Sequence, residues 1–294
     1  MRKAHLAELA NWLVPPLVFR CLTYYNWPAV ARFLRYRSVL RTNRELKDRH
    51  RGSRCFIVCN GPSVKNQDLR LLRGEHVFTV SSGYHHPDFH LFKPKYHCIP
   101  QITYATLPVD RAVDWLNEMH ASIGDAEIIM DAQERELVET RHLFPGRVVH
   151  YVCMGRNYFP LTSNWRVRLE GIIPRVQTVP VLVLMIAIYM GFQQIYLLGT
   201  DHDWFVTKRY DYFFPRSLMK AKETNVSQDG AMNNRIWEDL PEIKKIWGQY
   251  RAVKASAAAV GVDIFNATAG GMLDEFPRVD LKDLFRSSHA QSGA

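Results

Sequence analysis

From Arg54 onward, short apolar runs of strand length alternate with longer stretches that have helical spacing. Seven runs predict strands: CFIVC, HVFTVSS, KYHCI, AEIIM, VVHYVC, QIYLLG and VDIFN. Four stretches predict helices: VDRAVDWLNEMHA, DAQERELVETR, TVPVLVLMIAIYMGF and LPEIKKIWGQYRAVKASAAAVG. Such alternation is typical of a mainly parallel sheet covered by helices on both faces. The pattern therefore predicts an α/β domain over residues 51–285.

Two stretches depart from this alternation. The run Val179–Phe192 is apolar on every side, which predicts a buried helix too short to cross a membrane. Residues 202–242 follow a strand and mix aromatic, basic and polar side chains. Because so long a connection in a compact domain usually forms a lid or a binding insertion, we expect a lid at about 202–242. The last residues, 286–294, are expected to form a flexible tail.

The first 50 residues form a basic, aromatic arm that is expected to be helical. Residues 1–54 carry twelve Lys or Arg and three acids, whereas the rest of the chain carries 26 of each. A localised basic segment favours an anionic partner, and Trp and Tyr interleaved with Arg suit the headgroup region of a membrane. The alternative is a helical hairpin packed on the domain with its Arg face in solvent. No nucleic-acid-binding motif is present, so nucleic acid is not the expected partner.

The cysteine content indicates a reducing compartment. Five cysteines are scattered without a CxxC pair, and Cys55 and Cys59 share the inward side of one strand. Glu8 and the Pro15–Pro16 pair interrupt the apolar part of the first residues, so we expect no secretory signal peptide. These features predict a cytoplasmic protein that binds peripherally to the inner membrane through its arm.

Polar residues follow three of the predicted strands. In an open parallel sheet, ligands bind beyond the carboxyl ends of the strands. After CFIVC, Gly61 and Pro62 suit a tight turn, while Asn60 and Ser63 supply hydrogen-bonding groups for a nucleotide or phosphate. An Asn-Gly turn that joins a strand to a helix without any ligand would also explain this stretch. The other two strand ends carry Gly199, Asp201, His202 and Asp203, and Ser81, Ser82, Tyr84, His85 and His86.

IVCNGPSVK and TVPVLVLMIAIYMGFQQIYLLGTDHDW together resemble the bacterial CMP-sialic-acid transferases of glycosyltransferase family 42. They also resemble the broader group named after domain of unknown function 115, and NATAGGMLDEFPRVDLKDLF is similar to members encoded in surface-polysaccharide clusters. The resemblance covers roughly residues 54–285. It implies a Rossmann-like fold, a lid and, for the transferases, an inverting reaction that requires no metal.

Several site roles follow from this resemblance. Asn60, Gly61 and Ser63 match the residues that contact the nucleotide and its phosphate, and Asp201 matches the family's Asp after the second strand. Thr178 begins the buried helix, where the family has a Thr-Ser pair that touches the cytidine. Ser81 stands where the family has a donor-side Asn, and Asp203 stands where it has a phosphate-binding Tyr. Two lid residues are expected to replace that Tyr: Tyr210 and Tyr212. Tyr84, His85 and His86 are candidates for the acceptor side.

The catalytic base and a metal are less clearly indicated. The family's lid His is absent from the corresponding region, Pro241–Lys245, so His202 is expected to deprotonate the acceptor hydroxyl, with Asp203 as the other candidate. His202 could instead be a residue that only supports the site. Asp201 and Asp203 also form an Asp-x-Asp pair that could hold Mg or Mn, or could simply orient the lid. No cofactor is expected to be required, and the histidines from His85 to His97 lack a zinc-ligand spacing.

The resemblance leads us to expect a glycosyltransferase of polysaccharide or lipopolysaccharide biosynthesis. Its donor would be a nucleotide sugar, with a CMP-activated acidic sugar as the best candidate, and its acceptor a glycan or lipid-linked glycan. Two alternatives stay open: metal-dependent diphosphate transfer from ATP to a hydroxymethylpterin-like substrate, and a non-catalytic protein of glycan assembly.

Overall fold

The computed structural model describes residues 27–100, 102, 107–155, 166–220 and 226–290. Its centre is an eight-stranded sheet with the order β6-β5-β4-β3-β2-β1-β7-β8. Every pairing in this sheet is parallel. The strands are β1 (Arg54–Val58), β2 (His76–Val80), β3 (Tyr96–Ile99), β4 (Glu127–Asp131), β5 (Val149–Met154), β6 (Ile172–Ile173), β7 (Gln194–Leu198) and β8 (Asp263–Asn266).

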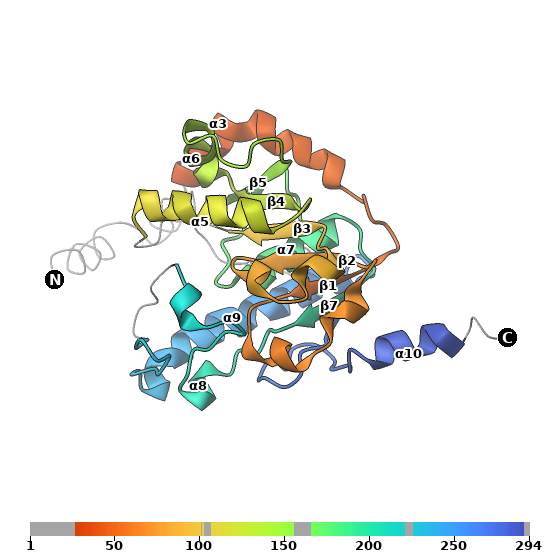
Figure 1. The fold of residues 1–294 in the computed structure, drawn as a ribbon. Coiled ribbons are helices and arrows are strands. Elements are labelled where there is room, and N and C mark those ends of the chain that lie inside the picture. The colour runs from red at the N-terminus through yellow and green to blue at the C-terminus, as the bar shows by residue number, and fades with distance from the viewer. Residues whose placement is uncertain (1–26, 101, 103–106, 156–165, 221–225, 291–294) are drawn as a thin grey trace, which may run out of the picture.

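Helices cover both faces of the sheet, as the alternating pattern predicts. The α-helices are α3 (Trp27–Thr42), α4 (Phe89–Phe92), α5 (Val109–Ser122), α6 (Arg135–Thr140), α7 (Val179–Tyr189), α8 (Trp204–Thr207), α9 (Ile236–Ala258) and α10 (Asp283–Ala290). One core contains α7 and α9 against one face of the sheet, and a second contains α3, α5 and α6 against the other. Figure 1 shows α3 beside β5 at one end of the sheet, with β1 and β7 towards the other end.

Helix α7 is buried on every side. All its residues from Pro180 to Tyr189 are buried, and they pack under β1, β2, β3 and β7. The prediction of a buried helix from Val179 onward is confirmed. None of the described helices is both long enough and apolar enough to cross a bilayer.

The described half of the N-terminal arm packs on the domain. Ala29, Tyr36 and Leu40 of α3 are buried, and the helix lies against β5. Four of the cysteines, Cys55, Cys59, Cys98 and Cys153, are buried free thiols. Cys55 and Cys59 lie in the same core, as their shared inward side predicts.

The predicted lid begins with α8 and contains two antiparallel bridges, Arg209–Ala231 and Val226–Met232. Helix α9 begins at Ile236, inside the expected lid range. The reason is a capping arrangement in which the backbone N–H of Arg235 donates to the Glu238 carboxylate (2.7 Å). At the other end of the chain, α10 continues to Ala290, through the first part of the expected tail.

Candidate functional site

The direction of the chain along the sheet reverses between β1 and β7. The chain steps from β1 outward to β6, then returns to place β7 on the other side of β1. The loops that follow these two strands therefore meet at one point, where doubly wound α/β proteins bind ligands. The Gly61 N–H donates to the carbonyl of Gly199 (3.0 Å), and the Cys59 N–H donates to Leu198 (2.9 Å). These backbone bonds extend the β1–β7 pairing into the two polar loops.

Ser63 and Asp201 form the polar centre of this meeting point. The Ser63 backbone N–H donates to Oδ1 of Asp201 (3.1 Å), and its hydroxyl donates to Oδ2 (2.8 Å). Both residues are only 6% exposed. Burial raises the pKa of the Asp201 carboxyl, the two bonds from Ser63 oppose this rise, and the nearby Asp203 charge adds to it. The carboxylate thus fixes the loop after β1 to the loop after β7.

Three glycines allow the backbone to close tightly around Asp201. A Cβ on Gly61 would lie 1.9 Å from Oδ2 of Asp201, and a Cβ on Gly199 would lie 2.7 Å from the Cys59 carbonyl oxygen. Gly271, at a φ of +74°, would bring a Cβ to 2.5 Å from the Asp201 carbonyl oxygen. A side chain at Gly61 or Gly271 would displace Asp201, and a side chain at Gly199 would displace Cys59 and Val64 in the segment after β1.

The third of these glycines belongs to a loop for which we predicted no site role. The Met272 N–H donates to the Asp201 carbonyl (2.7 Å), and Arg278 donates to the carbonyl of Gly271 (2.7 Å) and also to that of Gly270. Through these hydrogen bonds, the loop after β8 holds the backbone of Asp201 in place. The Gly-Gly pair in NATAGGM was the only sequence signal for this contact.

His202 lies in an aromatic enclosure. Its Nε2 is 2.7 Å from the Tyr250 hydroxyl, and its ring contacts those of Trp204 and Trp247. Burial lowers the pKa of His202 to about 4, so the ring is neutral near pH 7. The Tyr250 hydroxyl also lies 3.5 Å from Oγ1 of Thr178, which precedes α7. His202 and Thr178 are thus brought together through Tyr250, which resembles any other helical core residue in the sequence.

Asp203 differs from Asp201 and His202 because its side chain has no hydrogen-bond partner in another described residue. The backbone carbonyl of Asp203 accepts from Val206 and Thr207 at the start of α8. Within the described part of the chain, the hydrogen bond recorded for its carboxylate comes from its own backbone N–H, and no other residue forms a hydrogen bond or ion pair with it. Burial, with repulsion from Asp211 as a smaller cause, raises its pKa above the ordinary value. Of the two acidic side chains in this loop, Asp203 is therefore the one whose carboxylate can contact a bound ligand.

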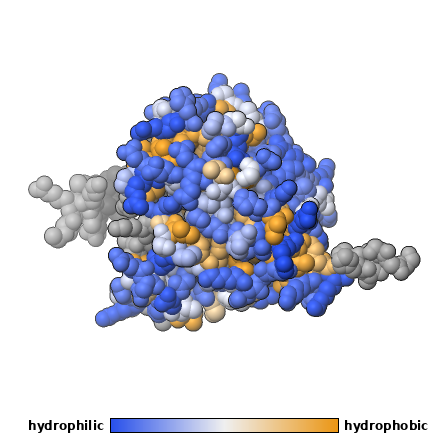
Figure 2. Space-filling view, in the orientation of Figure 1, coloured by the Kyte–Doolittle hydropathy of each residue, from blue (hydrophilic) through white to orange (hydrophobic). Residues whose placement is uncertain are grey.

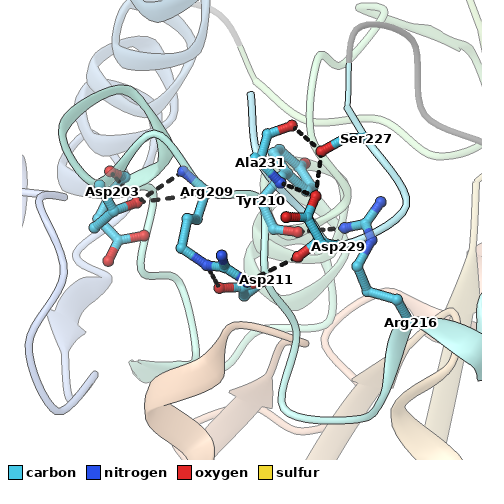
Figure 3. Close-up of polar contacts among 9 residues, drawn as sticks. Asp203, Arg209, Tyr210, Asp211, Arg216, Ser227, Asp229 and Ala231 are labelled. Atoms are coloured by element: carbon cyan, nitrogen blue, oxygen red, sulfur yellow. Dashed lines mark hydrogen bonds and ion pairs between the residues drawn. The ribbon is translucent and has the colours of Figure 1, made fainter. Parts of the chain in front are cut away.

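The lid is held together by its own polar contacts, which Figure 3 shows. Arg209 pairs with Asp211 (2.7 Å) and donates to the carbonyl of Asp229 (2.8 Å), while Arg216 donates to the carbonyl of Tyr210. The Tyr210 N–H donates to Gly230 (2.9 Å). These contacts give the segment a defined shape.

The lid also reaches the loop after β1. The Phe213 N–H donates to the Asn60 carbonyl (3.0 Å), and the rings of Tyr210, Tyr212 and Phe214 follow one another at 5.6 and 5.2 Å. Oδ1 of Asn60 is buried without a hydrogen-bond partner among the described residues. The structure thus brings Asn60, Tyr210 and Tyr212 towards the same side of the site.

The loop after β2 is packed beneath the lid. Tyr84 is buried and donates from its hydroxyl to Glu118 (3.1 Å). His85 contacts the ring of Phe214, and His86 contacts Phe213. Burial lowers the pKa of both histidines. These acceptor-side candidates therefore support the lid in this conformation.

The remaining candidates lie at the same strand ends. Ser81, at a φ of +45°, donates its N–H to Cys98 (3.0 Å), and Ser82 is buried next to it. Pro62 opens a short 3-10 helix, Pro62–Asn66, which carries Ser63.

No group of three or more His, Cys, Asp or Glu side chains is placed to hold a metal ion within the described ranges. Of the Asp201–Asp203 pair, both Asp201 oxygens already accept hydrogen bonds from Ser63, whereas the Asp203 carboxylate is open. The pair is therefore not arranged as two equivalent metal ligands.

No family model and no curated protein matches the chain. Solved structures of a bacterial sialyltransferase are similar to it at low identity. One is CstII from Campylobacter jejuni with a substrate analogue and cytidine-5'-monophosphate, at 16% identity and a TM-score of 0.42 over 78% of this chain and 85% of that one. Another is the CST-II complex with a trisaccharide acceptor and CMP, at 14% identity and a TM-score of 0.42 over 76% and 84%.

Proposed function

We propose that the protein is an inverting glycosyltransferase whose donor is a nucleotide sugar, with a CMP-activated acidic sugar as the preferred candidate. The observation that carries this proposal is the attachment of Ser63 to Asp201 at the point where the sheet reverses direction. This attachment presents the Asn60–Ser63 loop, which resembles a nucleotide-contacting motif, at the position where parallel sheets bind nucleotides.

Each part of the site has a role in the proposed reaction. The Asn60–Ser63 loop would bind the phosphate and nucleoside of the donor, and Thr178 at the start of α7 would contact the base. Tyr210 and Tyr212 would donate hydrogen bonds to the phosphate as it leaves. Closure of the lid over Asn60 would exclude water, which competes with the acceptor for the activated sugar.

Asp203 is the preferred general base. Its carboxylate is open, whereas Nε2 of His202 is occupied by Tyr250. In the proposed step, the ionised carboxylate accepts the proton of the acceptor hydroxyl while that oxygen bonds to the anomeric carbon. The bond from that carbon to the phosphate breaks on the opposite face, and its electron pair leaves with CMP. His202 would then position Thr178 and the loop through Tyr250.

The proposed acceptor is a cell-surface glycan or its lipid-linked precursor, as in polysaccharide or lipopolysaccharide biosynthesis. Because such precursors are anchored in the membrane, we also propose that the enzyme works at the cytoplasmic surface of the inner membrane, held there by its N-terminal arm.

Calorimetric titration with CMP, CDP, UDP, GDP and ATP, each with EDTA and with Mg²⁺, tests this proposal. We expect selective binding of CMP that does not depend on metal. Ser63→Ala should weaken it about tenfold, because the loop loses one hydrogen bond to a charged group. Ser122→Ala is the matched control. It removes a serine hydroxyl that donates to the backbone carbonyl of Glu118 within α5, and this variant should bind CMP normally.

Two results would overturn the proposal. Binding of ATP only with Mg²⁺ would indicate diphosphate transfer, with Asp203 as a metal ligand. CMP binding without transfer to any glycan acceptor would indicate a non-catalytic protein of glycan assembly.

A further inference from the structure

Helix α3 and the turn after it divide the basic residues of the arm into two sets. The first set pairs with acids of the domain: Arg32 with Asp131 (3.2 Å), Arg35 with Glu136 (3.3 Å), Arg49 with Glu127 (2.8 Å) and Arg54 with Glu75. Arg32 and Arg49 tie the arm to the carboxyl end of β4 and the amino end of the same strand. The charges of these four arginines are therefore paired with acids of the same chain.

The second set faces solvent. It consists of Arg37, Arg41, Arg44, Lys47 and Arg51, all of which are exposed. Among the residues that the structure describes, no ion pair is recorded for any of the five. Glu45 and Asp48 are the acids of this stretch, so its exposed part keeps a net positive charge. The five cations and two acids leave a net charge of +3 on this exposed surface.

Helical geometry places these charges in a row. Arg37 and Arg41 are four residues apart, and Arg44 follows three residues later, so the three side chains project from one side. The same side carries Leu34, which is 57% exposed, while the neighbouring stripe of the helix is buried through Ala29, Tyr36 and Leu40. In Figure 2 the top of the molecule, where Figure 1 places α3, is mainly hydrophilic.

We propose that the outer face of α3 and of the turn after it, from Leu34 to Arg51, docks on an anionic phospholipid bilayer. Guanidinium groups pair with lipid phosphates, and an exposed leucine beside them can enter the boundary between headgroups and acyl chains. The described structure starts at Trp27, just before this face. The 26 residues that precede it include the apolar stretch NWLVPPLVF, so apolar sequence continues from the same end. An apolar sequence next to a basic segment along the chain favours a bilayer over nucleic acid.

The position of α3 in the fold suits this orientation. The helix lies against β5, which is separated from β1 by β4, β3 and β2. Four strand spacings amount to about 19 Å, so docking through α3 leaves the loops after β1 and β7 clear of the bilayer. Docking through α3 assigns a surface to the membrane contact of the arm proposed above, and it does not depend on the transferase reaction.

The experiment is co-sedimentation of the full chain with vesicles of phosphatidylcholine alone and of phosphatidylcholine mixed with phosphatidylglycerol. The test variant is Arg37→Gln/Arg41→Gln/Arg44→Gln. The control variant, Arg73→Gln/Arg166→Gln/Lys244→Gln, removes the same charge from three exposed residues elsewhere. Wild type should bind the anionic vesicles selectively and lose binding as salt is raised.

The test variant should bind these vesicles about a hundredfold more weakly, whereas the control should lose much less. Equal binding by wild type and the test variant would overturn the proposal, as would failure of wild type to bind anionic vesicles. So would competition in which an RNA or DNA oligonucleotide displaces the vesicles at equal charge concentration. Thermal unfolding and CMP titration of both variants should match wild type, which separates loss of docking from misfolding and from failure of the proposed function.

Discussion

Replacing Gly61 with alanine separates backbone preference from packing at the strand-end loop. Gly61 has a φ of −62° and a ψ of 153°, which alanine adopts readily. From backbone entropy alone, the substitution should stabilise the protein by about 0.4–1 kcal/mol. However, the new Cβ would lie 1.9 Å from Oδ2 of Asp201 and 2.5 Å from the Gly199 carbonyl oxygen. The Asp201 carboxylate must move, and both of its bonds to Ser63 are then lost or strained.

The size of the effect follows from those two bonds. Hydrogen bonds to a charged group contribute about 1.5–3 kcal/mol each, and here the carboxylate is buried, so we expect a net loss of about 2–5 kcal/mol in the free energy of unfolding. Urea denaturation measures this loss, and calorimetry should show weaker CMP binding in the same variant. Gly248→Ala is the control, because its Cβ would meet nothing within 4 Å in helix α9.

That control should gain about 0.5–1 kcal/mol, as expected for alanine in a helix. If Gly61→Ala were as stable as wild type and bound CMP equally well, the close packing of the two loops around Asp201 could not be the feature that forms the site.

Three further predictions concern protons and catalysis. Asp203→Asn should lower turnover by about a hundredfold or more with little change in CMP affinity, whereas His202→Gln should weaken CMP binding; the reverse pattern would make His202 the base. Asp211→Asn removes a negative charge that raises the pKa of Asp203, so the acid limb of the pH–rate profile should move to lower pH, while Asp110→Asn, a remote exposed acid, should leave it in place. His97 is fully buried between Thr79 and the Ser81 carbonyl, and burial lowers its pKa from 6.5 to about 4. Because the unfolded chain binds this proton first, the His97 contribution to the free energy of unfolding should fall by up to about 3 kcal/mol as pH falls from 6.5 to 4. Urea unfolding should show this as a steeper pH dependence in wild type than in His97→Gln, and equal slopes would contradict the assignment.

The sheet could be predicted from sequence because its strands are buried on both faces. Each of the seven predicted runs is a strand, since continuous apolar residues of that length are typical of a parallel sheet. Strand β6 was not predicted because it has only two residues, Ile172 and Ile173. Helix α9 begins four residues before the predicted LPEIKK pattern, since the Glu238 cap stabilises a turn that the apolar spacing does not reveal.

The site could be predicted only where its residues directly follow strands. Asn60, Ser63 and Asp201 were identifiable because parallel strands end at the same edge, and the structure joins Ser63 to Asp201. Tyr250 and Arg278 were missed because Tyr250 lies within helix α9 and Arg278 lies twelve residues beyond the end of β8. Their roles depend on contacts across the fold, such as that between Tyr250 and His202. From the sequence we preferred His202 to Asp203 as the base, because nothing in it reveals that Tyr250 contacts the His202 ring nitrogen.

The pairing of β1 between β2 and β7 also has a consequence for biosynthesis. Ser63 and Asp201 are 138 residues apart, and the loop that supports Asp201 includes Gly271 and Arg278. A nascent chain can therefore pair β1 with β2 early, while the other neighbour of β1 is still being synthesised. The edge of β1 that will carry the site stays unpaired until β7 emerges, and Asp201 gains its support only after β8. The site is therefore completed late in synthesis, so a chain that stalls before β7 has most of a sheet and the Asn60–Ser63 loop but lacks Asp201 and the lid.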